Sequence, residues 1–129
     1  MKTIDNLLLD RLLSMAKENE RLRTGMDMRN SASDNSQRML NALLPGTKVD
    51  IHRHPVSDES VICLRGRLDE IIYDDNGNET SRISLSPADG RYGCQIPAGA
   101  WHTVEVFEPS VIFEAKDGRY GEDKSERKG

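Results

Sequence analysis

Apolar residues recur at helical spacing over the first twenty residues of the chain. The positions concerned are Ile4, Leu8, Leu12 and Met15. This spacing predicts an amphipathic helix within residues 1–20 that ends near Asn19 and packs on the domain or on a partner subunit. Thr3 is the expected N-cap, and Asp5 places a negative charge at the positive end of the helix dipole.

Short apolar segments separated by turn residues follow from residue 37 onwards. The run 37–44 fits a helix with a capping box at Asp34 and Gln37, but it stops after eight residues at Pro45-Gly46, which favours a strand. Asn76-Gly77 tolerates positive φ and predicts a hairpin turn. Further strands are expected at 47–53, 60–65, 68–74, 80–85, 92–96, 101–107 and 110–116.

Seven or more short strands at this spacing predict an all-β sandwich or barrel. With 129 residues the chain is long enough for one domain and too short for two. We therefore expect a helix over 1–20, a single β domain over 21–120 and a tail over 121–129. The tail has mixed charge and no apolar anchor, so we expect it to be disordered.

Charge and composition narrow the function classes. The chain has 18 Lys and Arg against 22 Asp and Glu, a formal net charge of −4. This balance argues against nucleic acid or an anionic membrane as the main partner. The apolar stretches are too short to span a bilayer, and no secretory signal pattern is seen. Cys63 and Cys94 are therefore interpreted as reduced thiols in a cytoplasmic protein.

The three histidines give the clearest chemical signal. His52 and His54 lie two residues apart in a predicted strand, so their side chains point to the same face. Glu59 follows across a turn-like segment, and His102 comes after the turn 97–99. Three imidazoles and a carboxylate suit a divalent transition metal with positions left for water or substrate.

Alternation along the strand after Glu59 predicts which side chains point inward. Glu59, Val61 and Cys63 share one face, and Ile62 and Leu64 share the other. Both faces carry apolar residues, as expected where one face lines an interior and the other meets a helix or a second subunit.

Other polar residues are weaker candidates. Arg38 and Asn41 point to opposite faces of a strand, so at most one of them lines a pocket. Trp101 alternates away from His102, which favours packing over substrate stacking. Three cationic side chains could bind a phosphate or carboxylate of a substrate: Arg65, Arg67 and Lys116. Such side chains are more often solvated surface charges.

The spacing of these residues resembles that of the cupins. The first cupin motif is matched in full by Gly46, His52, His54, Glu59 and Gly66. The second is matched by Pro97, Gly99 and His102, and departs at Arg91 and Val106, which leaves the histidine set intact.

Longer blocks resemble the WbuC-type cupin-fold metalloproteins over roughly residues 1–120. The matching blocks are Ile4-Asp5, Leu8-Leu9, Gln37-Arg38, Asn41–Thr47, His52–Pro55, Ile96–Gly99, Trp101–Thr103, Glu114–Gly118 and Tyr120. The type member of that group belongs to a bacterial surface-polysaccharide gene cluster.

The resemblance implies a single-domain jelly-roll β-barrel with a short N-terminal helix. It also implies that His52, His54, Glu59 and His102 converge on one divalent transition metal, with zinc, iron, manganese and nickel all open. In cupins the position of Glu59 either coordinates the metal or acts as a general base. Many cupins pair through outer sheet faces, which implies a homodimer.

The leading functional hypothesis is a metal-dependent enzyme that isomerises, epimerises or cleaves a sugar or other small oxygenated metabolite, with Glu59 moving the proton. One alternative is a non-catalytic, metal-containing module that binds a saccharide or metabolite. An iron-dependent oxygenase uses much the same ligands, and a metal-free structural protein is a further alternative. A ligand set does not by itself name a reaction.

Overall fold

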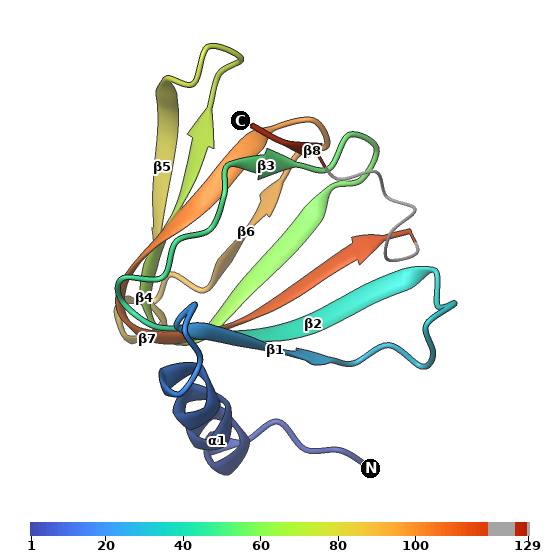
Figure 1. Ribbon diagram of the computed structural model, residues 1–129, viewed down its shortest axis with the longest axis vertical. Coiled ribbons are helices and arrows are strands. Elements are labelled where there is room, and N and C mark those ends of the chain that lie inside the picture. The colour runs from blue at the N-terminus through green and yellow to red at the C-terminus, as the bar shows by residue number, and fades with distance from the viewer. Residues whose placement is uncertain (119–125, 129) are drawn as a thin grey trace.

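The computed structural model describes residues 1–118 and 126–128, which form one helix, eight strands and a short 3-10 helix (Figure 1). The elements are α1 (Asn6–Lys17), β1 (Arg23–Asp27), β2 (Ser36–Leu43), β3 (His52–Arg53), β4 (Glu59–Tyr73), β5 (Glu79–Leu85), η1 (Pro87–Asp89), β6 (Gly93–Ile96), β7 (Trp101–Asp117) and β8 (Glu126–Arg127).

Two long bent strands, β4 and β7, organise the fold. Their pairing runs from 59–63 against 112–116 to 68–73 against 101–106, and the register shifts around Gly66 between these two parts. The two parts of this pairing, one on each side of the bend, belong to different layers of the sheet. One layer has the order β1, β2, β7, β4, β6, and the other has the order β5, β4, β7, β3, β8.

The all-β class with one short N-terminal helix is confirmed, but the sheet does not close into the expected barrel. Within the described residues, no pairing joins β1 or β6 to the edge strands of the other layer. The two layers are continuous only through β4 and β7, because these are the strands long enough to pass through the bend. The fold is therefore an open, two-layered sheet.

Two apolar clusters hold the layers and the helix together. The cluster between the layers consists of Leu43, Val61, Cys63, Leu68, Leu85, Ile96, Val106 and Ile112. The second cluster lies between α1 and the outer face of the first layer and consists of Leu9, Leu12, Ala16, Leu40, Ala42 and Val111. Strand β2 serves both clusters because successive side chains alternate between its faces.

The N-terminal helix is confirmed, but its buried face and its cap differ from the prediction. Leu9, Leu12 and Ala16 are buried, whereas Ile4 and Met15 are 43% and 53% exposed. The helix packs on β1 and β2 of its own chain, beneath which it lies in Figure 1. No helix of the described residues is long and apolar enough to cross a membrane.

Asp5, not Thr3, is the N-cap of α1, because its Oδ1 accepts a hydrogen bond from Leu8 N at 3.0 Å. We expect Asp5→Ala to lower the free energy of unfolding by about 1 kcal/mol, the usual effect of losing a capping side chain. Urea denaturation would measure the change. Thr3→Ala is the matched control and should leave stability unaltered; a larger effect of Thr3→Ala would contradict this cap assignment.

Several strand boundaries also differ. The run 37–44 is a strand, as favoured, but β1 was not expected. The segments 60–65 and 68–74 form one strand, as do 101–107 and 110–116, because the chain bends without ending the ladder. Of the segment expected at 47–53, only the last two residues are a strand, β3.

Of the tail expected at 121–129, the structure describes residues 126–128. Residues 126–127 form β8, which pairs with β3 through His52 and Arg127. Lys128 N also donates to Ile51 O at 2.8 Å. Backbone pairing holds this segment in place without an apolar anchor. The side-chain pattern of the sequence does not reveal such pairing. Residues 121–125 and 129 lie outside the described residues.

Candidate metal centre

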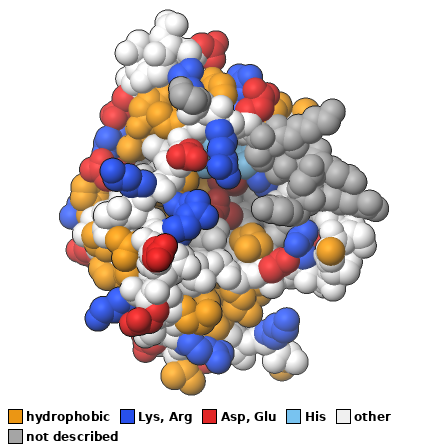
Figure 2. Space-filling view, viewed as in Figure 1, with side chains coloured by type: hydrophobic (Ala, Val, Ile, Leu, Met, Phe, Trp, Pro, Cys, Tyr) orange, Lys and Arg blue, Asp and Glu red, His pale blue; other side chains and the backbone are white. Residues whose placement is uncertain are grey.

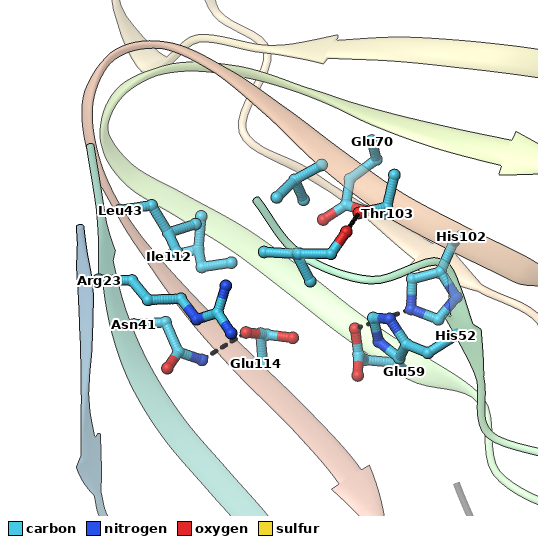
Figure 3. A pocket seen from close by; sticks show the side chains of 12 residues that line it. Arg23, Asn41, Leu43, His52, Glu59, Glu70, His102, Thr103, Ile112 and Glu114 are labelled. Atoms are coloured by element: carbon cyan, nitrogen blue, oxygen red, sulfur yellow. Dashed lines mark hydrogen bonds and ion pairs between the residues drawn. The ribbon is translucent and has the colours of Figure 1, made fainter. Parts of the chain in front are cut away.

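The three histidines and Glu59 come together between the two layers. His52 on β3 lies directly opposite His102 on β7. His54 follows β3, and its carbonyl accepts a hydrogen bond from Gly99 N at 2.9 Å, which ties it to the turn before β7. Glu59 begins β4. Figure 3 shows His52, His102 and Glu59 close together on one side of the cavity. The residues singled out from the sequence therefore meet at one place.

The spacing of the rings fits a single ion. Their centroids are 4.3 Å apart for His52 and His102, 5.2 Å for His52 and His54, and 5.5 Å for His54 and His102. One nitrogen from each ring lies within 4.8 Å of the others. Nitrogens bound to one ion at about 2.1 Å lie no more than about 4.2 Å apart, so small ring movements would complete the set.

Two of the rings are held with a nitrogen available to a metal. His52 Nδ1 lies 2.8 Å from Asp50 O and His102 Nδ1 lies 2.9 Å from Ala100 O. A carbonyl only accepts hydrogen bonds, so Nδ1 carries a proton in both rings, and Nε2 is the nitrogen that would bind a metal. His102 is 2% exposed, and within the described residues its Nε2 has no hydrogen-bond partner. A buried, unpaired acceptor fits a metal ligand.

His54 is held differently. Lys116 Nζ lies 2.9 Å from His54 Nδ1, and an ammonium group can only donate, so the ring proton sits on Nε2. That nitrogen lies 3.1 Å from Glu59 Oε2. A metal bound at His54 Nε2 would require this proton to move to Nδ1 and the Lys116 ammonium group to turn away from Nδ1.

The charges of the site also suit a cation. Burial, followed by the neighbouring His102, lowers the pKa of His52 to about 4, so this ring is neutral at pH 7. Burial by itself raises the pKa of Glu59, but contacts with the side chains of His102, His54 and Glu114 outweigh burial and hold the pKa well below its usual range. Glu59 is therefore an ionised carboxylate 3.7 Å from His102 Nε2.

The side chain of Glu114, on β7, contacts the side chain of Glu59. Burial raises the pKa of Glu114 well above its usual range, and the charge of Glu59 and a hydrogen bond with it raise the pKa further. Glu114 thus holds the proton that Glu59 lacks. Asn41 Nδ2 on β2 donates to Glu114 Oε1 at 2.5 Å. Asn41 lines the cavity while Arg38 bonds Asp34, so the prediction that at most one of the pair lines a pocket is confirmed.

Glu70 of β4 is a third acidic side chain of the cavity. It is 3% exposed, and within the described residues its Oε2 has no hydrogen-bond partner. Burial, and to a lesser extent the charge of Glu59, raise the pKa of Glu70 well above its usual range. No sequence motif marks Glu70, whereas Glu114 and Asn41 stand in blocks that resemble the WbuC-type proteins.

Glu70→Gln should change how stability depends on pH. The folded state holds the Glu70 proton more tightly than the unfolded state, so wild-type stability falls as pH rises from about 4.5 towards the folded pKa. Over that range the slope is up to about 1.4 kcal/mol per pH unit for one proton. Glutamine cannot ionise, so the variant should lose this slope and gain stability over wild type towards pH 8.

Urea denaturation of metal-stripped protein between pH 5 and 8 would measure the slope. Glu105→Gln, on an exposed side chain, is the matched control and should keep the wild-type slope. Parallel pH profiles for wild type and Glu70→Gln would contradict the assignment of a buried, protonated Glu70.

The site opens into a cavity of about 190 Å³, seen from close by in Figure 3. Its polar lining includes Arg23, Asn41, His52, Glu59, Glu70, His102, Thr103 and Glu114. The apolar lining includes Leu43 and Ile112. A cavity with a few convergent polar groups and several perturbed carboxyls is typical of a small-molecule site.

Three of the weaker candidates lie away from this cavity. Trp101 Nε1 donates to Asp75 Oδ1 at 3.1 Å and Arg53 stacks on its ring at 4.3 Å, so Trp101 is a packing residue, as expected. Arg65 pairs with Asp10 of α1 at 2.6 Å. Arg67 stacks on the ring of Phe107 at 4.7 Å. Of the cationic candidates, only Lys116 reaches the histidines.

Comparison with protein families gives one match. A family model described as "Domain of unknown function (DUF6016)" matches residues 4–85. A comparison with curated proteins gives no match.

Solved structures share the fold at low sequence identity. TT1209 from Thermus thermophilus is 25% identical, with a TM-score of 0.66 over 92% of this chain and 99% of that one. A cupin 2 domain-containing protein from Halorhodospira halophila is 16% identical, with a TM-score of 0.65 over 83% and 70% of the two chains. The capsular polysaccharide assembling protein CapF from Staphylococcus aureus is 19% identical, with a TM-score of 0.61 over 78% and 29%. The chain thus spans less than a third of CapF.

Proposed function

This chain belongs to the DUF6016 family and has a cupin fold, and from its histidine site we propose that it is a metal-dependent enzyme acting on a sugar or other small oxygenated metabolite. The observation that carries the proposal is the convergence of three imidazoles and an ionised Glu59 at one place, where His52, His102 and Glu59 also line the cavity. The reaction class that fits best is isomerisation, epimerisation or elimination. Each of these reactions begins with the removal of a proton at or next to a carbon that bears a carbonyl or hydroxyl group.

Each residue has a defined part in this proposal. His52, His54 and His102 hold the metal. A bound divalent ion supplies Lewis acidity towards adjacent carbonyl and hydroxyl oxygens. Glu59 is ionised and lies beside the histidines, so it can accept a proton from the substrate. Protonated Glu114, positioned by Asn41, orients Glu59 by hydrogen bonding.

A closer relationship to the WbuC-type cupins is part of the proposal, and with it a link to surface-polysaccharide metabolism. Two of the resembling blocks contribute Asn41 and Glu114 to the cavity, which supports the relationship. The description of CapF as a capsular polysaccharide assembling protein points in the same direction, although that likeness concerns the fold. The proposed homodimer is supported by the pairing of many cupins through outer sheet faces.

Elemental analysis of protein purified without a histidine tag tests the proposal. We expect close to one divalent metal per chain in wild type and less than about a tenth of that in His52→Ala and His102→Ala, because each variant removes a ligand from a three-histidine set. Circular dichroism would establish that both variants are folded. Little metal in wild type, with no uptake of zinc, iron, manganese or nickel, would overturn the proposal.

Glu59→Gln distinguishes the two roles of this residue. If Glu59 ligates the metal, the variant loses metal; if it acts only as the base, the variant keeps its metal and loses turnover. Iron in wild type would direct the first assays to oxygenation, and manganese, zinc or nickel to isomerase and lyase reactions on sugars.

A further inference from the structure

We propose that the substrate carries an anionic group, a phosphate or a carboxylate, that binds a set of cationic side chains at the mouth of the metal centre. This cationic mouth consists of Arg21, Arg23, Lys116 and Arg127. The inference rests on the proposed function, because it names the substrate class of the same site and the direction in which the substrate enters.

The cationic mouth is continuous with the metal centre. It lines a hollow of about 280 Å³ whose lining also includes His52 and His54. Arg23 and His52 line both this hollow and the deeper cavity. Among the described residues that line the hollow, one carboxylate, that of Asp50, lies with the four cations. Figure 2 shows blue Lys and Arg side chains around a depression in which a histidine is visible, with red acidic side chains deeper inside.

The backbone holds these cations in place. Thr47 Oγ1 donates to Arg21 O at 2.7 Å, which fixes the segment between α1 and β1. Arg23 Nη1 donates to Lys48 O at 2.5 Å, and the rest of its planar guanidinium keeps donors for a ligand. Figure 3 shows the Arg23 guanidinium reaching into the cavity from β1. A guanidinium suits the bidentate binding of phosphate or carboxylate oxygens.

The other two cations come from the far end of the chain. Lys116 lies on β7, with Nζ 2.9 Å from His54 Nδ1. Arg127 lies on β8, directly opposite His52 of β3 in the ladder. Its Nη1 is 3.5 Å from Asp50 Oδ2, and its side chain is 75% exposed, so an incoming anion can compete for it. Strand β8 therefore places a positive charge at the mouth of the metal centre.

The lining of the inner cavity differs from that of the mouth and favours one orientation of the substrate. Glu59, Glu70 and Glu114 lie inside, where their carboxyl groups offer hydrogen-bond partners to a hydroxyl group, whereas the mouth offers cationic partners to an anionic group. The anionic end therefore stays at the mouth and the hydroxylated end reaches the histidines. An inner cavity of about 190 Å³ admits the end of a small molecule and excludes a folded polymer.

Titration with inorganic phosphate, followed by ¹⁵N–¹H NMR of zinc-loaded and of chelator-treated protein, tests the inference. Arg23→Gln with Arg127→Gln should weaken phosphate binding by about tenfold, because it removes two charge-assisted contacts. Arg65→Gln with Arg67→Gln is the matched control: it makes the same change in net charge away from the cavity and should change the affinity by less than about twofold. Both double variants should keep the metal content of wild type.

Two results would overturn the inference. Phosphate binding that is lost on chelation and is indifferent to Arg23 and Arg127 would mean that the anion only ligates the metal. Equal weakening in both double variants would mean that overall charge, not the cationic mouth, governs binding.

The outcomes also separate this inference from the proposed function. Normal metal content in wild type without phosphate binding overturns the anion site and leaves the metal centre standing. Phosphate binding that depends on Arg23 and Arg127 in a chain that takes up no metal supports the anion site and overturns the metal centre.

Discussion

Replacing Gly66 with alanine should lower the free energy of unfolding by about 3 kcal/mol or more. Gly66 has φ +96°, a conformation that costs other residues about 1–2 kcal/mol. An added Cβ would also overlap Pro109 O and lie 2.7 Å from Ser110 Cα, both backbone atoms of β7. Relieving the overlap means moving β7 away from the bend, and such overpacking costs about 1–3 kcal/mol more.

The bend is held by contacts that this movement would break. Arg67 N donates to Ser110 Oγ at 3.1 Å, and Ser110 Oγ in turn donates to Glu108 O at 2.7 Å. Because Glu59 and His102 lie on opposite sides of the bend, Gly66→Ala should also lower metal content.

Gly90→Ala is the matched control for this experiment. Gly90 has φ +76°, but no atom lies within 4 Å of the position its Cβ would take, so only the conformational cost of about 1 kcal/mol applies. Urea denaturation of both variants measures the difference. If the two variants were equally destabilised, the close approach of β4 and β7 at Gly66 would not be what stabilises the bend.

The histidine set could be predicted from the sequence because its signal is local. His52 and His54 share a face through simple alternation, and the turn at 97–99 places His102 at the start of the next strand. The alternation of Glu59, Val61 and Cys63 is confirmed by their burial, with Ile62 exposed, for the same reason.

The rest of the site depends on register between distant strands, which no local pattern specifies. Glu114 and Asn41 meet because β2 pairs over its whole length with the second half of β7, although 73 residues separate the two in sequence. Glu70 lies in a strand whose composition resembles that of the neighbouring strands, so nothing local distinguishes this residue. Arg23 lies on β1, whose sequence RTGMD has too little alternation to predict a strand.

The bend in β4 and β7 explains why each was predicted as two strands. Gly66 and Pro109 are ordinarily residues that end strands, and here they turn the chain while the ladder continues. The N-terminal helix shows a similar limit. The sequence offers two apolar stripes on this helix, the predicted one with Ile4 and Met15 and another with Leu9 and Ala16. Packing against Leu40 and Ala42 of β2 buries the second stripe.

Removing the metal should lower the free energy of unfolding of wild type by about 4 kcal/mol, relative to protein with free zinc at about 1,000 times its dissociation constant. The ligands are brought together only in the folded chain, since His52 and His102 belong to different strands that pair across the site. Without metal, the folded state keeps His102 Nε2 buried and unpaired within the described residues. Metal binding satisfies this acceptor, and the unfolded chain gains little from it.

Urea denaturation with chelator and with zinc measures this stabilisation, and the double variant His52→Ala with His102→Ala is its control. The chain has three histidines in all, so no imidazole outside the site can account for a zinc effect in wild type. The double variant should therefore unfold at the same urea concentration with zinc or chelator. A zinc effect that persists in the double variant would assign it to carboxylates or cysteines elsewhere. Identical wild-type curves with chelator and with zinc, manganese, iron or nickel would contradict a metal centre here.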